Sequence, residues 1–233
     1  MTMLAADNDF MIKGLFSYEL FGHTLWITTS HVALVMVVII LIGFAWIANR
    51  RIKKAEEVPG VFQNIIELIV EKLDQVVSGS MGAFAGKFQN YISTIFLFIL
   101  LCNISGIFGL RSPTADYGIT LLLGLVTFAL IHINGIKRHK IGHFTSWFQP
   151  LPLLFPINVI GDLATPLSLS LRLFGNVMSG TVMIGLWYGM LPWFMKLGIP
   201  AFLHAYFDLF SGAIQTYVFC MLTMVYIRDK IIG

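Results

Sequence analysis

The sequence predicts an all-α integral membrane protein with five membrane-crossing helices and one interfacial amphipathic helix. Of its 233 residues, 57% are hydrophobic and 12% are charged, and the mean hydropathy is +0.82. Soluble domains are far less apolar. The apolar residues also gather into runs of about 20 residues or more, the length that crosses a hydrocarbon core of about 30 Å. This pattern excludes a disordered or nucleic-acid-binding chain, although the formal net charge is +3.

We expect a single membrane domain over 1–233 that begins with an outer segment at 1–29. The first span is predicted at 30–49, because this uncharged stretch ends at a basic cluster of the kind that favours the cytoplasmic side. Residues 59–78 instead carry apolar side chains at three- and four-residue spacing, with charged and amide side chains between them. That pattern is typical of an amphipathic helix lying in the membrane interface.

A helical hairpin is predicted at 90–135, with a short polar turn between two uncharged runs. Longer runs follow at 152–193 and 198–227. A helix of about 40 residues would be about 60 Å long, twice the hydrocarbon thickness, so it must be tilted, bent or folded back. Pro166 predicts a bend near Asp162, because proline removes a backbone donor. Periodicity leaves open whether 152–193 is one bent helix or two.

The distribution of basic residues predicts the orientation. Nine Lys and Arg residues flank the span ends on one side and three on the other, which favours an outer N-terminus and a cytoplasmic C-terminus. The nine are Arg50, Arg51, Lys53, Lys54, Lys137, Arg138, Lys140, Arg228 and Lys230, and the three are Lys13, Arg111 and Lys196. Cys102 and Cys220 lie inside apolar runs without metal-ligand spacing. We expect no cofactor and no resident metal.

Arg172 lies near the middle of the run at 152–193. An arginine at mid-membrane costs about 2.5–3.5 kcal/mol and stays charged, so it must face a partner or water. Small and polar residues recur at helical spacing around it: Gly161, Thr165, Ser168, Gly175, Asn176 and Ser179. A purely structural alternative is that these small residues let helices pack closely, with Arg172 salt-bridged to Asp162 or Asp208.

The run at 198–227 carries a second row of polar groups. His204, Asp208, Ser211 and Gln215 follow one another at spacings of four, three and four, so we expect them on one helical face, with Thr216 and Tyr217 off it. Two opposed polar faces, one with a permanent cation, indicate an ion route through the membrane. A binding site for an anionic substrate would look similar.

The segment 166–176, PLSLSLRLFGN, resembles the signature of the bacterial subunit a family of the rotary F-type ATP synthase. Gln215 and the segment 217–227 resemble the closing part of that family, and the order of elements agrees over nearly the whole chain. The resemblance implies a fold in which the last two long helices are strongly tilted against a ring of c subunits. It also matches 59–78 to the family's interfacial helix.

The resemblance implies that Arg172 is the stator arginine facing the carboxylate that each c subunit carries. A fixed cation favours the charged form of that carboxylate, so the ion is released there. Two half-channels, one from each side, would carry protons by default, with sodium in transit as the alternative. Gln215 and Asn176 match the family's glutamine and asparagine near the arginine. The subunit would couple ion flow to rotation and ATP synthesis without being catalytic itself.

One departure from the family concerns the outer half-channel. Many members carry a glutamate nine residues after the arginine and a histidine seven before the glutamine, where this chain has Thr181 and Asp208. We expect Asp208, with His204, to replace the missing acid from the other helix. Hydroxyl and carboxylate groups at Ser179, Thr181, Asp208 and Ser211 would also suit hydrated sodium. Asp162 is expected either to line the cytoplasmic half-channel or to be a charge satisfied at the interface.

The implied partners are the c-subunit ring, the subunit b peripheral stalk, the rest of the ATP synthase and membrane lipid, with no nucleic acid. The implied location is the bacterial inner membrane. A second hypothesis is a secondary transporter that binds an anion at Arg172, although no repeat of the arginine stripe appears elsewhere. A third, remote hypothesis is an intramembrane serine protease built on Ser179 and His204. The first glycine of a Gly-x-Ser-Gly motif is missing there.

Overall fold

Helices hold almost all of the residues that the structure describes. The computed structural model describes residues 14–20, 23–53, 60–140, 142, 146–148, 152–190 and 198–232. Five helical stretches are long and apolar enough to cross a membrane: Thr29–Ile52, Val61–Phe108, Tyr117–His139, Phe155–Met190 and Ala201–Ile232. The predicted fold class, a helical membrane protein with five helices able to cross, is confirmed.

The N-terminal region departs from the all-α prediction. Two short strands, β1 (Gly14–Leu20) and β2 (His23–Thr28), pair in antiparallel fashion before the first helix. The second strand is rich in β-branched and aromatic residues, which fit a pleated strand, but it has only 6 residues and adjoins a much longer apolar run. The sequence pattern of the hairpin is therefore hidden by the span that follows.

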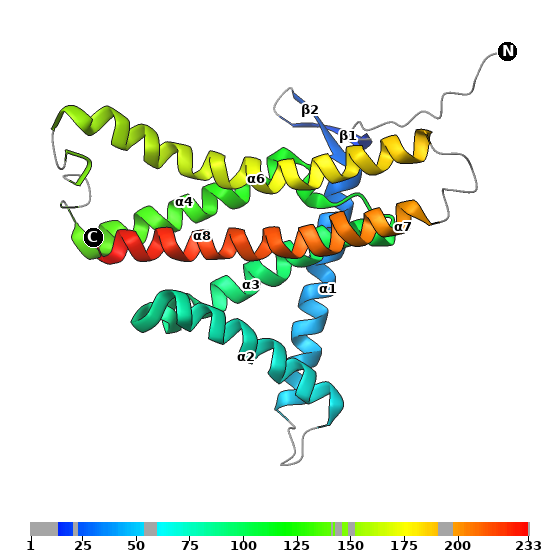
Figure 1. The fold of residues 1–233 in the computed structure, drawn as a ribbon, viewed down its shortest axis with the longest axis horizontal. Helices are drawn as coiled ribbons and strands as arrows, with labels where there is room; N and C mark the ends of the chain where they lie inside the picture. Colours follow the sequence, from blue (N-terminus) through cyan, green and yellow to red (C-terminus); the bar gives the residue numbers. More distant parts are fainter. Residues whose placement is uncertain are drawn as a thin grey trace.

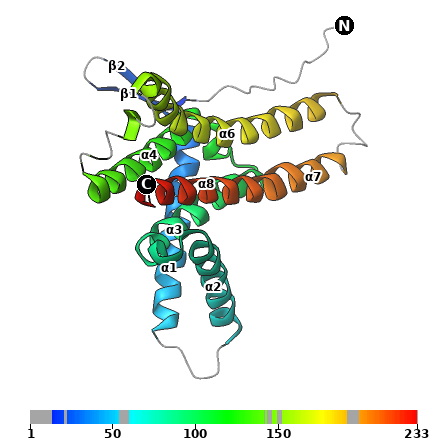
Figure 2. The ribbon, with the colours of Figure 1, turned by 60° about the vertical axis from the view of Figure 1, so that its left-hand side comes forward.

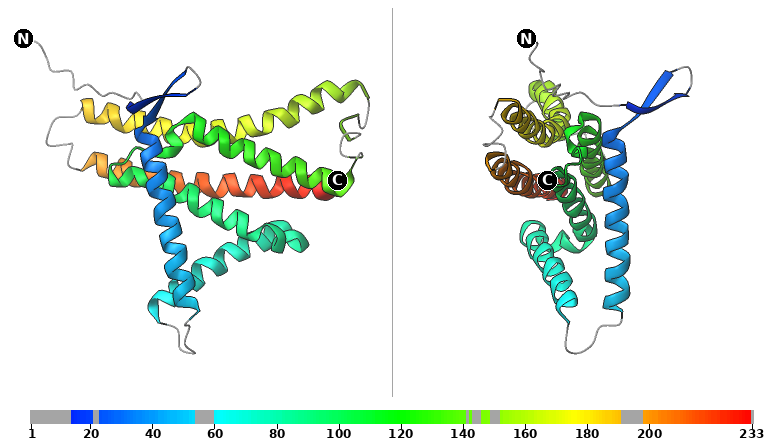
Figure 3. Two further views of the ribbon diagram at one scale, coloured as in Figure 1. Left: turned by 180° about the vertical axis from the view of Figure 1, so that it is seen from behind. Right: turned by 90° about the vertical axis from the view of Figure 1, so that its right-hand side faces the viewer.

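The first helix, α1 (Thr29–Ile52), stands at one edge of the molecule, as the right-hand view of Figure 3 shows. Thr28 Oγ1 lies 2.6 Å from His31 Nδ1 across its first turn. In its last turn the Arg50 guanidinium lies 3.7 Å from the centre of the Trp46 ring. Most of its side chains are exposed. An apolar helix that this chain leaves uncovered is suited to contact with lipid or with another membrane subunit.

The amphipathic stretch forms α2 (Val61–Met81), which buries only one stripe of its apolar side chains. Gly82 follows with φ of 55°, a left-handed conformation that glycine adopts at little cost. The chain therefore changes direction before α3 (Ala85–Ile104), and Figure 1 shows the two helices diverging. The buried stripe of α2 consists of Ile66, Leu73, Val77 and Met81.

Helix α4 (Tyr117–His139) follows α3 after a short connection, as expected for the hairpin at 90–135. The last helix, α8 (Gly212–Ile232), packs against both of them and lies between them, as Figures 1 and 3 show. The two helices therefore form an opened hairpin rather than a closely packed pair. Buried polar groups hold α8 there, because Asn103 Nδ2 donates to the Gly212 carbonyl at 3.0 Å and to Thr216 Oγ1 at 3.2 Å.

Within the predicted run at 152–193, Phe155–Met190 forms one long helix, α6, of 36 residues, so this part is one bent helix and not two. Pro166 lies inside it, and its axis changes direction in Figures 1 and 2. We attribute the bend to Pro166, whose missing N–H leaves a carbonyl one turn earlier unbonded. Gly124 of α4 approaches closely, since a Cβ at Gly124 would lie 2.6 Å from the Pro166 carbonyl oxygen.

The last helical stretch has three parts: α7 (Ile199–His204), a π-helical segment (Ala205–Ser211) and α8. The hydrophobic core runs along α8, which packs against α2, α3, α4 and α6. Its most deeply buried side chains from α8 are Phe219, Cys220, Met224 and Ile227, and those from other helices include Val77, Met81, Ile92, Ile99, Ile131, Leu169 and Leu173. The chain's last helix is therefore its central one.

Candidate functional site

Arg172 is exposed on α6, well away from both helix ends. It makes no hydrogen bond or ion pair with any residue that the structure describes. The acidic residues that could have paired with it are engaged elsewhere: Asp162 lies 2.7 Å from Lys230 Nζ, and Asp208 lies 2.7 Å from His204 Nδ1. The structural alternative, a salt bridge from Arg172 to Asp162 or Asp208, is therefore wrong for the described part of the chain.

The small and polar residues around Arg172 are also uncovered. Gly161, Ser168, Gly175 and Ser179 are exposed, whereas Thr165 and Asn176 are half-buried. A Cβ added at Gly161 or Gly175 would meet no atom within 4 Å. Small residues that serve close packing within a chain lie against a neighbouring helix. The part of this chain that the structure describes leaves the stripe open to an outside partner.

The polar row predicted on the last helical run is divided between two faces. The cause is the π-helical segment Ala205–Ser211, whose i→i+5 hydrogen bonds widen each turn and shift the register. Asp208 lies on the face toward Gly106, where a Cβ would come within 2.9 Å of Asp208 Oδ2. Ser211 lies on the face toward α6 and donates to Asn176 Oδ1 at 2.9 Å. The prediction of one shared face is wrong, because it assumed regular α-helical spacing throughout.

His204 and Asp208 form a bonded pair, as the resemblance led us to expect. Thr181 does not join them, because its hydroxyl donates to the Val177 carbonyl of its own helix at 3.0 Å. Ser179 likewise donates to the Asn176 carbonyl at 2.9 Å. The acid beside His204 is therefore on the last helical run itself, and the hydroxyls of Thr181 and Ser179 donate to carbonyls of their own helix.

Asn176 and Gln215 lie on the two helices that frame the Arg172 region. Asn176 is tied to Ser211, so that an amide and a hydroxyl join α6 to the π-helical segment. Gln215, one turn after Ser211, is buried, and its Nε2 has no hydrogen-bond partner among the described residues. Leaving a buried amide donor unpaired costs about 1–3 kcal/mol. Such a group is therefore usually paired with water or with another molecule.

Asp162 is the centre of a second polar cluster, which sequence reasoning found only in part. Its Oδ2 accepts from Trp147 Nε1 at 2.7 Å and from Lys230 Nζ at 2.7 Å. His132 Nε2 lies 3.7 Å from the same oxygen. His132 lies in the apolar run of α4, before the basic end of that helix. In the sequence, Lys230 contributes only to the pattern of basic residues that predicts the orientation. Nothing in the sequence indicated that they converge.

No group of three or more His, Cys, Asp or Glu side chains suited to a metal ion is found in the described ranges. The polar groups near Arg172 are amides and hydroxyls, which donate and accept hydrogen bonds and can therefore bind water or a hydrated ion. The arrangement combines one exposed cation with separate polar clusters toward each end of the long helices.

The sequence model of the family described as ATP synthase A chain matches residues 31–228. Among known proteins, the sodium ion specific ATP synthase subunit a of Propionigenium modestum is 38% identical, over 97% of this chain and 81% of its own length. ATP synthase subunit a of Acidothermus cellulolyticus is 37% identical, over 86% of this chain and 74% of its own length. That of Limosilactobacillus fermentum is 33% identical, over 94% and 98%. The chain therefore belongs to the ATP synthase A chain family, which comprises the membrane-embedded, ion-translocating subunit of ATP synthase.

Proposed function

We propose that Arg172 is the stator cation that meets the carboxylate of each passing c subunit. The observation that supports this most is its exposure, without an internal partner, on a stripe of small residues that the described chain leaves open. A guanidinium stays protonated even inside the membrane, where an unpaired charge is costly, so it needs an anion from another subunit. A carboxylate beside it is held in its charged form and releases its ion.

Two half-channels would meet at Arg172. The outer one passes the His204–Asp208 pair and the hydroxyls of Ser179, Thr181 and Ser211, with Asn176 and Gln215 hydrating the region beside the arginine. The inner one passes Asp162. Because Arg172 separates them, an ion that binds the ring from one side leaves on the other only after the ring has turned.

The transported ion is a proton or sodium. The relative from Propionigenium modestum is described as sodium ion specific and is 38% identical to this chain. Carboxylate and hydroxyl oxygens at Asp208 and Ser211 are hard ligands that suit hydrated sodium, and the same groups also relay protons. Selection would rest mainly on the c-ring site, and protons remain the default.

The proposed partners are the c ring against α6 and α8, the peripheral stalk subunit b, and the rest of the complex. The subunit itself performs no bond-making step. Its proposed place is a bacterial inner membrane, with the N-terminus outside and the C-terminus in the cytoplasm, in accord with basic residues at the ends of α1 and α4. The family match over residues 31–228 favours neither an anion transporter nor a serine protease.

The test replaces Arg172 by alanine in the whole complex, reconstituted in liposomes. Without the fixed cation the passing carboxylate has no counter-charge, so ion-driven ATP synthesis should fall by roughly a hundredfold, the factor to which about 2.8 kcal/mol corresponds. ATP-driven pumping should fall equally, while the subunit still assembles. Ser168→Ala, on the same open stripe, is the control and should retain most activity. Coupled synthesis by Arg172→Ala at the parent rate would refute the stator role.

A further inference from the structure

The Asp162 cluster borders a cavity where α4, α6 and α8 meet. The cavity has a volume of about 170 Å³, enough for several water molecules, and Asp162, His132, Lys230 and Thr165 contribute to its lining. The other lining residues are Phe128, Ile131, Tyr226 and Asp229. Thr165 lies two helical turns before Arg172, about 10 Å along α6. The cavity thus lies between the end of the helices and the Arg172 region.

The donors at Asp162 are distributed unevenly over its carboxylate. Trp147, Lys230 and His132 all approach Oδ2. The Lys230 ammonium, 2.7 Å from Oδ2, therefore occupies the place beside the carboxylate that a mobile cation would take. As long as Lys230 is there, Asp162 presents a neutralised pair to an ion in the cavity.

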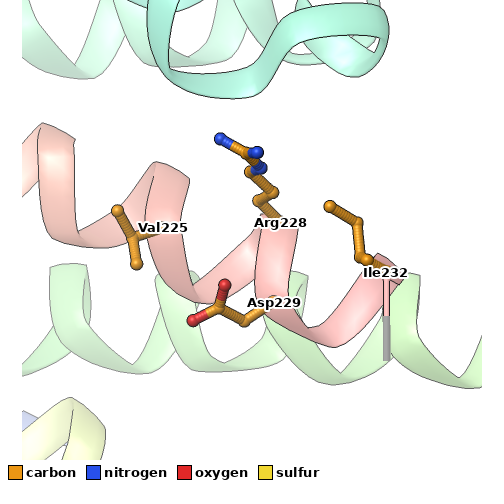
Figure 4. Close-up of a pocket in the computed structure, with 4 residues that line it drawn as sticks. All are labelled: Val225, Arg228, Asp229 and Ile232. Carbon is orange, nitrogen blue, oxygen red and sulfur yellow. The ribbon is translucent and has the colours of Figure 1, made fainter.

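The end of α8 does not depend on Lys230 for its position. Arg228 Nη1 donates to the Ser80 carbonyl at 2.9 Å, at the end of α2. His139 Nε2 lies 3.1 Å from the Ile231 carbonyl and links α8 to α4. Figure 4 shows Arg228 pointing toward α2, with Asp229 on the other side of the helix. Lys230 can therefore swing away on its flexible stem while α8 stays docked.

We propose that Lys230 is a tethered cation that competes with the transported cation for Asp162 and so gates the inner half-channel. This inference rests on the proposed role of Asp162 as part of that channel. His132 and Trp147 hold the carboxylate in place when Lys230 leaves, and Asp229, exposed beside the cavity, bears the other negative charge there. Either transported ion needs the same step, because a proton and sodium both bind a carboxylate oxygen that Lys230 has released.

The experiment uses the whole complex in liposomes with its ATPase head outside, so that ATP-driven pumping takes up ions from the Asp162 side. Pumping is measured against sodium concentration at fixed pH, and against pH in sodium-free buffer. The transported ion is the one, sodium or the proton, whose concentration changes the pumping rate. Lys230→Gln should lower the half-saturating cation concentration by about three- to fivefold, the size of effect that a partly exposed ion pair supports.

Asp162→Asn should raise the half-saturating concentration, and the double variant should match Asp162→Asn alone, since Lys230 then has no carboxylate to compete for. Lys137→Gln, which removes an exposed cation at the end of α4 outside the cavity, should leave it unchanged. Lys230→Arg keeps the ion pair, so it should assemble even if Lys230→Gln does not. It should give a concentration equal to or above that of the parent.

Two results separate the gate from the channel. If Lys230→Gln leaves the half-saturating cation concentration unchanged while Asp162→Asn shifts it, Lys230 is not a gate, and the channel role of Asp162 stands. If Asp162→Asn itself behaves like the parent, the proposed inner path through Asp162 is wrong and the gate falls with it. A lowered half-saturating concentration in Lys230→Arg would also overturn the gate.

Discussion

Asp162 and Arg172 lie ten residues apart on α6, about 15 Å along the helix, and their surroundings are opposite. Asp162 is half-buried and has donors from α4, α8 and the segment at 146–148. Arg172 is exposed and has no partner among the described residues. One helix thus carries one charge that neighbouring residues satisfy and one charge that no described residue satisfies. The difference shows that two charges in one apolar run can have opposite surroundings, which depend on the segments that pack against each of them.

The largest effect is expected when Arg172 is given an internal partner. Ser168→Asp places a carboxylate one turn away, at a spacing where side chains meet. An ion pair within α6 would compete with the c-ring carboxylate, so coupled ATP synthesis should fall about tenfold although Arg172 is intact, which corresponds to about 1.4 kcal/mol of competing attraction. The measurement is ATP synthesis in reconstituted vesicles.

The matched control is Ser168→Asn, which has nearly the same size and no charge and should retain most activity. If the Asp and Asn variants are equally active, a carboxylate placed beside Arg172 within α6 does not impair its function.

The second test concerns the bend at Pro166, which lies between the two charges. Gly124→Ala would bring a Cβ to 2.6 Å from the Pro166 carbonyl oxygen and force α4 and α6 apart. Overpacking of this kind destabilises by about 1–3 kcal/mol, which thermal unfolding of the purified complex should register as a lower midpoint. Gly161→Ala makes the same helical exchange on α6 where a Cβ meets nothing within 4 Å, and it should not lower the midpoint. Equal midpoints for both variants would argue against the close contact.

The smallest effect is expected at Gly106, on the opposite side of the Arg172 region from Asp162. Gly106→Ala would place a methyl group 2.9 Å from Asp208 Oδ2, the end of a side chain that can move aside. Stability should change little, and ion uptake from the outer side should slow by about two- to fivefold because the carboxylate is displaced from His204. ATP synthesis rates at limiting outer ion concentration provide the measurement. Gly109→Ala is not a fair control, since Gly109 has φ of 72°, so Gly79→Ala, with nothing within 4 Å of its Cβ, serves instead.

Periodicity and composition predicted the helical elements because each depends on residues near one another in sequence. The uncharged run at 30–49 was enough to predict α1, and the three- and four-residue spacing at 59–78 was enough to predict α2. The exposure of Arg172 also followed from the cost of burying a guanidinium. The β1–β2 hairpin was missed, since two short strands give little signal beside a long apolar run.

The residues around Asp208 show where local reasoning stops. The sequence of Ala205–Ser211 does not show by itself whether the segment is α-helical or π-helical, and in the structure it packs against glycines of two other segments. Gly180 makes room for Phe207, and Gly106 makes room for Asp208. These glycines come from different helices, so no pattern within the last run could predict that Asp208 and Ser211 face different ways.

The amino-acid pattern alone was enough to predict the apolar spans, the amphipathic helix, the orientation signal and one cation that must face a partner or water. All of these follow from local hydropathy and the energy of a charge in hydrocarbon, which do not depend on how the helices meet. Only the tertiary structure decided that α8 opens the hairpin of α3 and α4, that the last polar row is divided, and that Lys230 and His132 converge on Asp162. Those outcomes depend on side-chain fit between segments far apart in sequence, since Asp162 and Lys230 are 68 residues apart.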